Sequence, residues 1–497
     1  MDFSTLALDR TTGDALYQQL AASLAGVIST GDLAAGARLP SERELAFSLG
    51  VSRTTTVNAY RELEARGLVR GFVGRGTFVC ADPAPATAVT RGAPFAWRGK
   101  VALRAQDAAD ISLRRLIHTA IDPAVISFSA GSAALDCFPL DAFKAMTDRV
   151  LAREARTALG LGPVDGQPRL RRAIASRSGV DPERVLILSG AQQGLDLIAR
   201  CLIDAGDVVV IDRPGYLGAS QSFRGAGARL VGWDVKRGDL SELDDLLLRY
   251  RPKLLYTCPT FQNPTGVTLD ERTRRGLLEL AARHRIPVVE DDPYRELGFA
   301  GPAPRTLAAL DAGDLVIHIG TFAKTLAGGL RLGWLAAAPA IVDHLAQIKG
   351  TTDVATNGLT QLVVAEMLIS GVYDEHLAAL RAEHALRQES MLHAIVRDTP
   401  PGAITTRRVK GGLYLWCRLG LGLESRELLR GAVAAGVTFA AGQHFYADSA
   451  GGDEVRLCFS NVPPPLIADG VRRIGAVMRR TLASPSRTVD ADPIPLP

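Results

Sequence analysis

The chain has 497 residues, of which 47% are hydrophobic and 22% charged, and its formal net charge is +4. This length exceeds what one compact core usually holds, so we expect two or three domains. The composition is ordinary for a soluble globular protein, and a net charge this small does not by itself indicate any partner.

Targeting and redox features point to the cytoplasm. No apolar run approaches the roughly 18 residues of a membrane span, and Met1 to Leu20 lacks a signal-peptide pattern. The six cysteines are scattered, with no CxxC pair and no nearby histidine cluster. We therefore predict a cytoplasmic protein with reduced thiols, no membrane association and no metal site.

The first 80 residues have the pattern of a small winged domain. Helices are expected over 15–29, 42–49 and 53–66. Ser41 and Glu44 form a capping box at the start of the second helix, and Ser52 caps the third. Two short helices joined by a tight turn predict a helix-turn-helix, and the β-type runs of 67–79 around a Gly-Arg-Gly tip predict a hairpin, or wing.

A helix-turn-helix reads DNA through the residues at the start of its second helix. We predict DNA contacts from Ser52, Arg53, Thr54 and Thr55 at that position, and from the flanking residues Arg43, Arg75 and Gly76.

The alternative is a small helical domain with no nucleic-acid role. Residues 1–80 contain eight arginines, no lysine and eight acidic residues, so their net charge is zero. Because phosphate affinity depends on clustered positive charge, DNA binding requires the arginines to lie on one face and a dimer to combine two such faces. We expect this segregation, with the acidic residues falling away from the turn and the wing tip: Asp9, Asp14, Glu62 and Glu64.

Three segments of this domain resemble the GntR-family winged helix-turn-helix. They are Arg38–Ala46, Gly50–Val57 and Leu63–Val69, within a match of about 65 residues. The resemblance implies a DNA-binding domain over 1–80 that binds a double-stranded operator as a dimer, with its recognition helix in the major groove.

Composition separates this domain from the rest of the chain. Residues 81–124 are rich in Ala, Pro, Asp and Arg and are expected to form a flexible linker. The Pro-, Asp- and Ser-rich end, 483–497, is expected to be a disordered tail.

From Val185 onward, short apolar runs alternate with helical stretches. β-type runs occupy 185–188, 208–212, 228–233, 254–258, 287–290, 315–319 and 332–336. This alternation predicts an α/β domain with a mostly parallel seven-stranded sheet that helices cover on both faces. In such sheets the ligand site forms from the loops beyond the strand ends.

The loop between the last two runs carries Thr321, Lys324 and Arg331. Burial would lower the pKa of Lys324 toward that of a usable nucleophile, and a Schiff base with a carbonyl is one such use. Thr321 and Arg331 could bind an anion beside it, which favours a phosphorylated aldehyde as the ligand. The alternative is a surface lysine in a Gly-rich loop.

Other polar residues follow the remaining strands. Ala191 and Gln192 begin a helix whose free amides could bind phosphate, although a Gly-containing turn is often mere packing. Tyr216 could stack on a flat ring. Asn263 lies in an Asn-Pro-Thr-Gly segment that could also be a simple turn. Acidic residues at the end of the fifth run, around Asp291, are costly to bury unless one faces a cation.

Together these segments resemble the fold-type I pyridoxal-phosphate aminotransferases of the kynurenine/α-aminoadipate aminotransferase-like group. The motifs are Ser189–Gln193, Asn263–Gly266, Asp291–Tyr294 and Thr321–Lys324, in the family's order. The resemblance implies a cofactor-binding domain over 125–482. It implies a large part over about 146–339 and a smaller α+β part formed by about 126–145 and 340–482.

The resemblance also implies roles around a bound pyridoxal 5'-phosphate. Lys324 is the catalytic lysine that binds the cofactor's aldehyde carbon. The other cofactor contacts are Asp291 at the pyridine nitrogen, Tyr294 and Asn263 at the ring oxygen, Tyr216 on the ring face, and Thr321, Arg331, Ala191 and Gln192 at the phosphate. Arg456 corresponds to the arginine that pairs with a substrate carboxylate, the alternative being a surface arginine on a strand.

Two positions depart from the family pattern. Leu161 stands where a tyrosine usually reaches the neighbouring subunit's cofactor phosphate, and His384 stands where tyrosine is frequent. Leucine cannot donate a hydrogen bond, so the phosphate is expected to be held more weakly or by other groups.

A GntR-type DNA reader joined to an aminotransferase-like domain resembles the MocR/GabR-type regulators. This architecture implies a homodimeric, DNA-associated transcriptional regulator that responds to an amino-acid-like or vitamer effector through pyridoxal phosphate. Two alternatives remain open: a working aminotransferase with an accessory DNA-binding domain, and a cofactor-free scaffold.

Overall fold

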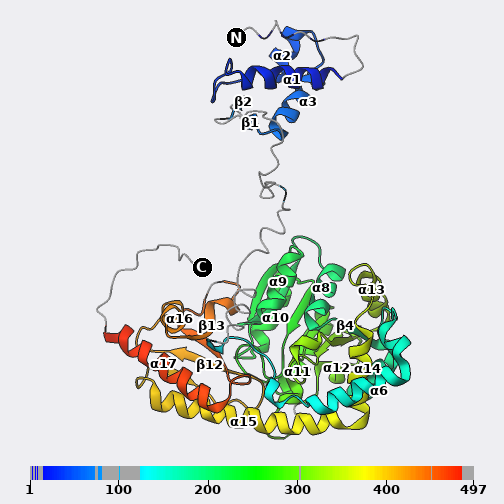
Figure 1. Cartoon of the computed structure of the whole chain (residues 1–497), viewed down its shortest axis with the longest axis vertical. Coiled ribbons are helices and arrows are strands. Elements are labelled where there is room, and N and C mark those ends of the chain that lie inside the picture. The colour runs from blue at the N-terminus through cyan, green and yellow to red at the C-terminus, as the bar shows by residue number, and fades with distance from the viewer. Residues whose placement is uncertain are drawn as a thin grey trace. The chain divides into compact units, whose positions relative to one another are not determined.

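The computed structural model describes residues 15–72, 76–80, 100, 124–301, 304–448 and 450–483, together with residues 3, 6 and 8. The chain divides into two compact units, Met1–Lys100 and Val101–Pro497 (Figure 1). Apart from Lys100, Ala124 and Ala483, the predicted linker and tail lie outside the described residues. Within the described part of the chain, no helix is long and apolar enough to cross a membrane.

The first unit is a helical domain with a two-stranded hairpin. Its elements are α1 (Leu16–Ser29), α2 (Glu42–Leu49), α3 (Arg53–Ala65), β1 (Val69–Phe72) and β2 (Gly76–Val79). The predicted capping box is present at Ser41 and Glu44, and Ser52 caps α3 by accepting a hydrogen bond from Thr55 N. The strands pair antiparallel, so the predicted winged helix-turn-helix is confirmed.

One small core holds this unit together. Fully buried side chains come from each helix and both strands: Leu20, Leu24, Leu45, Leu63, Val69 and Val79. The ring of Tyr60 is also buried, and its hydroxyl donates a hydrogen bond of 2.8 Å to Pro40 O. This hydrogen bond joins α3 to the segment that precedes α2.

The second unit contains the predicted seven-stranded sheet. Its strands are β4 (Val185–Leu188), β5 (Val208–Arg213), β6 (Arg229–Asp234), β7 (Leu254–Thr257), β8 (Val288–Asp291), β9 (Val316–Thr321) and β10 (Gly333–Ala336). Their order is β4-β10-β9-β8-β7-β5-β6. Strands β5 to β9 run parallel, whereas β10 is antiparallel to both of its neighbours. The prediction of a mostly parallel sheet is confirmed.

Helices cover both faces of this sheet because successive residues of each strand point to opposite sides. Val209 packs with α8 (Ala191–Leu202), α9 (Leu217–Gly225) and α13 (Pro339–Gly350), whereas Val210 packs with the helices of the other face. That other face carries α6 (Leu140–Leu159), α7 (Pro168–Ser178), α10 (Leu240–Tyr250), α11 (Glu271–His284), α12 (Leu307–Leu310) and α14 (Gly358–Ser370).

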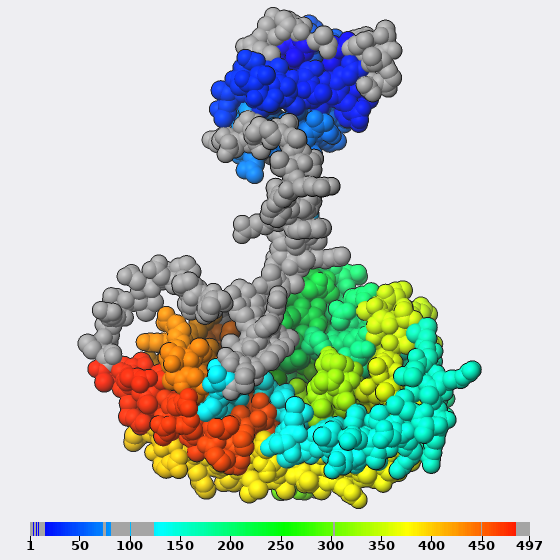
Figure 2. Space-filling model, in the orientation of Figure 1, coloured from blue at the N-terminus to red at the C-terminus, as the bar shows by residue number. Residues whose placement is uncertain are grey.

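A smaller five-stranded sheet completes the second unit. It has the order β11-β12-β14-β13-β3 and consists of β3 (Ile126–Phe128), β11 (Ile404–Thr406), β12 (Tyr414–Leu419), β13 (Val437–Ala441) and β14 (Glu454–Cys458). Three helices belong to this part: α15 (Val372–Asp398), α16 (Ser425–Ala434) and α17 (Pro464–Ala483). The long α15 runs along the lower edge of the unit, where Figure 2 shows it in yellow beside α17 in red.

The carboxyl ends of the parallel strands form one edge of the large sheet. The antiparallel β10 begins at this same edge, because Gly333 pairs with Leu188 of β4 and Thr321 of β9. The loops after β4, β5, β7, β8 and β9 therefore converge there, as the sequence predicts for a ligand site.

Candidate functional site

A cavity of about 590 Å³ opens at this edge, between the large sheet and the small one. Its walls include every residue that the sequence analysis assigns to the cofactor and to the substrate carboxylate: Ala191, Gln192, Tyr216, Asn263, Asp291, Tyr294, Thr321, Lys324, Arg331 and Arg456. These residues come from loops after five strands of the large sheet and from β14 of the small one. The chain thus brings them into one space.

Lys324 lies in the loop after β9, with its amine in the cavity. Its Nζ donates a hydrogen bond of 2.6 Å to the carbonyl of Gly131. Burial, followed by the positive charge of Arg456, lowers the pKa of Lys324 to about 8. A substantial fraction of the amine is therefore neutral near physiological pH, which is the form that attacks a carbonyl carbon.

Asp291 is the last residue of β8 and is buried at the base of the cavity. Its carboxylate accepts a hydrogen bond of 2.7 Å from the Tyr256 hydroxyl. Burial raises the pKa of Asp291 to about 6, and the neighbouring Asp292 adds to this effect, while Tyr256 and Lys324 oppose it. A buried carboxylate of this kind suits a ligand that presents a positively charged N–H group.

Asn263 belongs to a loop that buried polar groups hold in place. Its Nδ2 donates to the Tyr294 hydroxyl at 3.3 Å, and that hydroxyl lies 3.2 Å from the Tyr414 hydroxyl. The loop is anchored by Gln262, whose Nε2 donates to the carbonyl of Pro214 at 2.7 Å and to Asp212 Oδ2 at 3.3 Å. The side chain of Asn263 therefore enters the cavity from a rigid support.

Tyr216 forms another wall of the cavity. Its hydroxyl donates to Gln192 Oε1 at 3.1 Å, and Gln192 Nε2 in turn donates to Gly218 O at 3.0 Å. This chain of hydrogen bonds joins the loop after β5 to the start of α8. It holds the Tyr216 ring at the cavity, where the sequence analysis expects a stacking surface.

The start of α8 and the Arg331 guanidinium form a cradle suited to an anion. Ala191 and Gln192 begin the helix, where free amides and the helix dipole favour negative charge. Arg331 Nη2 donates to Ser189 O at 3.2 Å. The approach is close: a Cβ added at Gly190, which has φ +97°, would lie 2.9 Å from Arg331 Nη2. Only glycine leaves room for the guanidinium here.

Arg456 is buried, and among the described residues it has no carboxylate partner. Its Nη1 donates to Asn263 Oδ1 at 2.8 Å and its Nη2 to Ser129 O, while Nε has no hydrogen-bond partner in the described part of the chain. The rings of Tyr414 and Phe445 flank the guanidinium, with centroids at 4.2 and 4.9 Å. A buried cation without an anion fits a ligand that carries a carboxylate.

Several residues that build this cavity are not predicted from the sequence. Tyr256, Tyr414 and Phe445 contact the ligand-facing groups, and Gly131 accepts the hydrogen bond from Lys324. Asp212, with a pKa that burial raises to about 6, accepts from Cys258 N at 2.9 Å beneath the Asn263 loop. Asp212 could have been suspected from its position at the end of a predicted strand. The hydrogen bonds of these residues join distant parts of the chain and therefore leave no local sequence pattern.

The two departures from the family pattern lie away from the cavity walls. Leu161 is 82% exposed. His384 is fully buried on α15, and neither ring nitrogen has a partner in the described chain. Burial, followed by the charge of Arg387, lowers the pKa of His384 to about 3, so the imidazole is neutral.

Among the residues predicted to contact DNA, Ser52 to Thr55 lie at the start of α3, whereas Arg43 lies on α2 and Gly76 on β2. Arg43, Ser52, Arg53 and Thr54 are exposed, and Thr55 is half-buried. Ser52 Oγ lies 2.8 Å from Thr55 Oγ1 as part of the helix cap, and Arg53 Nη2 pairs with Glu42 Oε2 at 3.1 Å. Gly76 opens β2 with φ +104°, while Arg75 lies outside the described residues.

The predicted separation of acidic residues from the wing tip stays a prediction, because residues 73–75 lie outside the described residues. Glu64 Oε1 accepts a hydrogen bond of 3.0 Å from Gly71 N, so Glu64 lies against β1 of the hairpin. Glu62 instead pairs with Arg66 at 2.8 Å at the far end of α3. The hairpin's unpaired backbone amide attracts the carboxylate, an interaction that sequence position does not reveal. Asp9 and Asp14 lie outside the described residues.

Comparison with known proteins gives the class of this molecule. The family model "Aminotransferase class I and II" matches residues 123–474, and "Bacterial regulatory proteins, gntR family" matches residues 16–79. The 2-aminoadipate transaminase of Thermus thermophilus is 36% identical over 400 residues, covering 78% of this chain and 99% of that protein. The chain therefore combines a GntR-type DNA-binding domain with a domain of the class I and II aminotransferase family, which typically binds pyridoxal phosphate.

Solved structures agree in fold. The crystal structure of LysN, the α-aminoadipate aminotransferase of Thermus thermophilus, superimposes with a TM-score of 0.74 at 34% identity. It covers 78% of this chain and 100% of that one. The second unit thus has the fold-type I aminotransferase architecture.

Full-length relatives define the subfamily. MocR of Rhizobium meliloti, a probable rhizopine catabolism regulatory protein, is 32% identical over 479 residues, covering 94% of this chain and 95% of that protein. The HTH-type transcriptional regulator YisV of Bacillus subtilis is 30% identical over 480 residues, covering 94% and 97%. The chain belongs to the MocR-type regulators of the GntR family.

Proposed function

We propose that this MocR-type regulator holds pyridoxal 5'-phosphate in the cavity of its second unit and changes its DNA binding when an amino compound with a carboxylate enters. One observation carries the proposal. The cavity combines a lysine of lowered pKa, a buried aspartate, an anion cradle and a buried arginine that has no anionic partner among the described residues.

The donor set fits the cofactor group by group. The cradle of Ala191, Gln192, Thr321 and Arg331 suits a phosphate, and Lys324 suits the aldehyde carbon. Opposite them, the Asp291 carboxylate would accept a hydrogen bond from a pyridinium N–H and keep that nitrogen protonated. Asn263 and Tyr294 would donate to the ring oxygen, and Tyr216 would cover the ring. When bound, the cofactor supplies a reversible covalent bond to a primary amine.

Arg456 selects the effector. A carboxylate that accepts hydrogen bonds from Nε and one Nη of Arg456 would give the unpartnered Nε an acceptor and would neutralise the charge of the guanidinium. A protein of the same fold holds a ligand of this kind, because the LysN structure is a complex with N-(5'-phosphopyridoxyl)-L-leucine, an adduct of cofactor and amino acid. An amine and a carboxylate are therefore the two features that we expect in the effector.

The signal requires that the effector bind two arrangements of the protein with different affinity. The cavity suits this, because its walls come from both parts of the second unit. Lys324 belongs to the large sheet and contacts Gly131, while Arg456 belongs to the small sheet and contacts Ser129 and Asn263. A ligand that joins Lys324 to Arg456 draws the two parts together. We further propose a homodimer, whose two DNA-binding domains read repeated half-sites.

The test is DNA binding by the purified full-length protein. Fluorescence anisotropy with DNA from upstream of its own gene is measured with and without pyridoxal phosphate, across a panel of amino acids and amines. We expect one amine to change the affinity, and Lys324→Ala and Arg456→Gln to abolish that change while leaving effector-free binding to DNA. The proposal is contradicted if neither the cofactor nor any amine changes the affinity of the protein for any of the upstream DNA sequences.

A working aminotransferase is the second candidate, favoured by the complete set of groups around Lys324. The two functions differ in turnover. With an amino donor and a keto-acid acceptor, an enzyme would cycle at about 1–1000 per second, whereas a sensor would complete at most one slow half-reaction. Following the cofactor's absorbance with and without the acceptor separates them.

A further inference from the structure

The loop that carries Asn263 is held in place by a buried arginine that lies outside the cavity wall. This loop, residues 259–269, belongs to the connection between β7 and α11. Arg274 lies near the start of α11, and its side chain is fully buried. We propose that Arg274 is a positioning residue for the cofactor site: it fixes the loop and thereby directs the Asn263 amide toward the ring oxygen.

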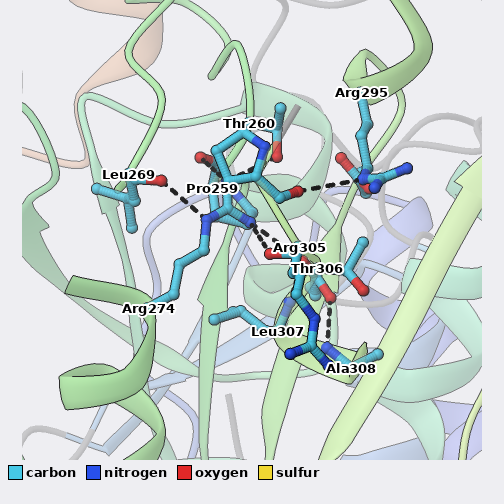
Figure 3. A network of polar contacts seen from close by, with 12 residues as sticks. Pro259, Thr260, Leu269, Arg274, Arg295, Arg305, Thr306, Leu307 and Ala308 are labelled. Carbon is cyan, nitrogen blue, oxygen red and sulfur yellow. Dashed lines mark hydrogen bonds and ion pairs between the residues drawn. The ribbon is translucent and has the colours of Figure 1, made fainter. Parts of the chain in front are cut away.

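Arg274 binds both ends of the loop. Its Nη2 donates hydrogen bonds of 2.8 Å to Pro259 O and Thr260 Oγ1 at the start of the loop. Its Nε donates to Leu269 O at the end of the loop, also at 2.8 Å. Figure 3 shows these acceptors around the guanidinium. The two ends also bond to each other, because Leu269 N donates to Pro259 O at 2.9 Å. One planar guanidinium thus closes the base of the loop, an arrangement that the compact ammonium of a lysine does not reproduce.

The acidic partner of Arg274 leaves these hydrogen bonds to the loop. Glu290 on β8 is fully buried and lies 3.7 Å from Arg274 Nη1, which is too far for a hydrogen bond. The Glu290 carboxylate instead accepts from Leu307 N at 2.8 Å and from Ala308 N at 2.9 Å, at the start of α12. Glu290 therefore balances the charge of Arg274, while the guanidinium N–H groups bind the loop. An arginine that served only to pair with a carboxylate would be expected to form direct hydrogen bonds with it.

The loop requires such support because its backbone is strained close to Asn263. Phe261 is buried and has φ +48°, in the left-handed region that residues with a side chain rarely adopt. A conformation of this kind persists only where the surrounding structure imposes it. Thr260, the residue before Phe261, is one of those that Arg274 binds. Loss of this contact is expected to let the backbone relax and to turn Asn263 away from its partners.

Asn263 would pass such a displacement to two other cavity residues. Its Oδ1 accepts from Arg456 Nη1 at 2.8 Å, and its Nδ2 donates to the Tyr294 hydroxyl at 3.3 Å. A shift of the amide would weaken its contact with the ring oxygen and would change the support of Arg456. Binding of the cofactor and of a carboxylate should therefore both weaken. This effect on ligands rests on the proposed function, whereas the support of the loop does not.

The absorption spectrum of the bound cofactor provides a readout that a merely structural role would not change. A hydrogen bond to the ring oxygen favours the charged form of that oxygen, so its loss should raise the pH midpoint of the cofactor's absorption change. Arg274→Lys keeps a positive charge beside Glu290. In full-length protein supplied with pyridoxal phosphate, we expect it to raise this midpoint and to weaken cofactor binding about three- to tenfold, in the same direction as Asn263→Ala.

A double-mutant cycle tests whether Arg274 acts through Asn263. In the Asn263→Ala background, Arg274→Lys should change neither the midpoint nor the cofactor affinity any further. Additive effects of the two changes overturn the proposal. Thr260→Val removes one acceptor of Arg274 and keeps the shape of the side chain, so it should shift the midpoint in the same direction by a smaller amount. It takes the place of Arg274→Lys in the cycle where that variant does not fold.

Trp233→Phe is the matched structural control. Trp233 is buried in the core that includes Leu277 of α11, and its Nε1 donates to Asp239 O at 2.9 Å. This variant also loses a buried hydrogen bond, but it does not touch the Asn263 loop. It should lower the thermal unfolding temperature and leave the spectroscopic midpoint unchanged. A midpoint in Arg274→Lys equal to that of the unmodified protein would make the role of Arg274 purely structural and overturn the proposal.

Hydrogen exchange in the cofactor-free protein separates this proposal from the proposed function. Exchange of the amides in residues 260–269, among them Leu269 N bonded to Pro259 O, reports the loop directly. We expect faster exchange there in Arg274→Lys than in the unmodified protein or in Trp233→Phe, and unchanged exchange overturns the proposal. An unmodified protein that binds no pyridoxal phosphate contradicts the proposed function and with it the cofactor role of Arg274, while the exchange still shows whether Arg274 holds the loop.

Discussion

The Nζ of Lys324 donates a hydrogen bond of 2.6 Å to the carbonyl of Gly131, a residue 193 positions earlier in the chain. This contact joins the loop after β9 of the large sheet to the segment that follows β3 of the small sheet. It also depends on the absence of a side chain, because a Cβ added at Gly131 would lie 1.7 Å from the Tyr414 hydroxyl oxygen. The closure of the cavity therefore requires glycine at this position.

Gly131→Ala is expected to displace Tyr414, whose ring packs against the guanidinium of Arg456. The overlap costs about 1–3 kcal/mol in the free energy of unfolding, and the effector response should weaken more than cofactor retention does. Denaturant unfolding and an effector titration measure the two effects. Gly329→Ala is the matched control, because nothing lies within 4 Å of a Cβ there. Equal behaviour of the two variants would show that Tyr414 moves freely.

Attachment of pyridoxal phosphate should depend on pH through Lys324. The neutral amine is the nucleophile, so the attachment rate should rise as pH increases through about 8, the lowered pKa of Lys324. Because the positive charge of Arg456 contributes to this lowering, Arg456→Met should move the midpoint to higher pH. Stopped-flow absorbance over pH 6–10 provides the measurement.

The exposed Arg418 on β12 offers a control for that experiment, since Arg418→Met removes a charge that pairs with Asp453 at the surface. Its midpoint should equal that of the unmodified protein. A midpoint near 10 in the unmodified protein would contradict the burial of Lys324.

The sequence predicts the framework of this cavity well and its internal contacts poorly. Strands such as β7 and β8 are recognisable because buried parallel strands consist of short apolar runs, and the polar residues that follow them must meet at one sheet edge. The hydrogen bonds from Tyr256 to Asp291 and from Lys324 to Gly131 join distant elements. No local pattern encodes such pairs, because their geometry depends on how the two sheets pack.

The first unit illustrates the same limit. Capping by Ser41 and Ser52 is local and was predictable from spacing. The contact of Glu64 was not, because its carboxylate, on α3, accepts a hydrogen bond from Gly71 N of β1. Side-chain direction at the end of a helix depends on what packs there, so a charge distribution inferred from chain position alone is unreliable.

Asp291 should make the stability of the cofactor-free protein depend on pH. Burial raises the pKa of Asp291 to about 6, above its ordinary value of 3.8. The folded state therefore binds the proton more tightly than the unfolded state. This contribution is fully present below about pH 4 and is lost as pH rises through about 6, by up to about 3 kcal/mol. Asp291→Asn, which cannot titrate, should lack this component of the stability profile.

Denaturant unfolding at a series of pH values checks this effect, with the difference between the two proteins removing contributions from other groups such as Asp212. Bound cofactor should restore stability above pH 6 in the unmodified protein, because a pyridinium N–H favours the carboxylate. Identical pH profiles for the two cofactor-free proteins would contradict the assignment.

Arg53 should be a major determinant of DNA affinity in the first unit. Arg53 is exposed at the start of α3. Arg53→Ala should weaken operator binding about tenfold or more. The loss of a phosphate contact by Arg53 would also lower the slope of log affinity against log salt concentration by about one. Anisotropy titrations at several salt concentrations measure both. Arg66→Ala, at the opposite end of the same helix and paired with Glu62, should have little effect; an equal loss would indicate non-specific attraction.

The ion pair of Arg53 with Glu42 adds a prediction of opposite sign. DNA must compete with this carboxylate, 3.1 Å from the guanidinium, and Glu42 itself would lie near the phosphates. Glu42→Gln should therefore tighten DNA binding, whereas exposed ion pairs contribute only about 0–1 kcal/mol to stability, so the fold should be little affected. In the Arg53→Ala background, Glu42→Gln should tighten DNA binding less, because Glu42 then no longer competes with DNA for the guanidinium of Arg53. A double-mutant cycle of DNA affinities tests this coupling, and strict additivity would contradict it.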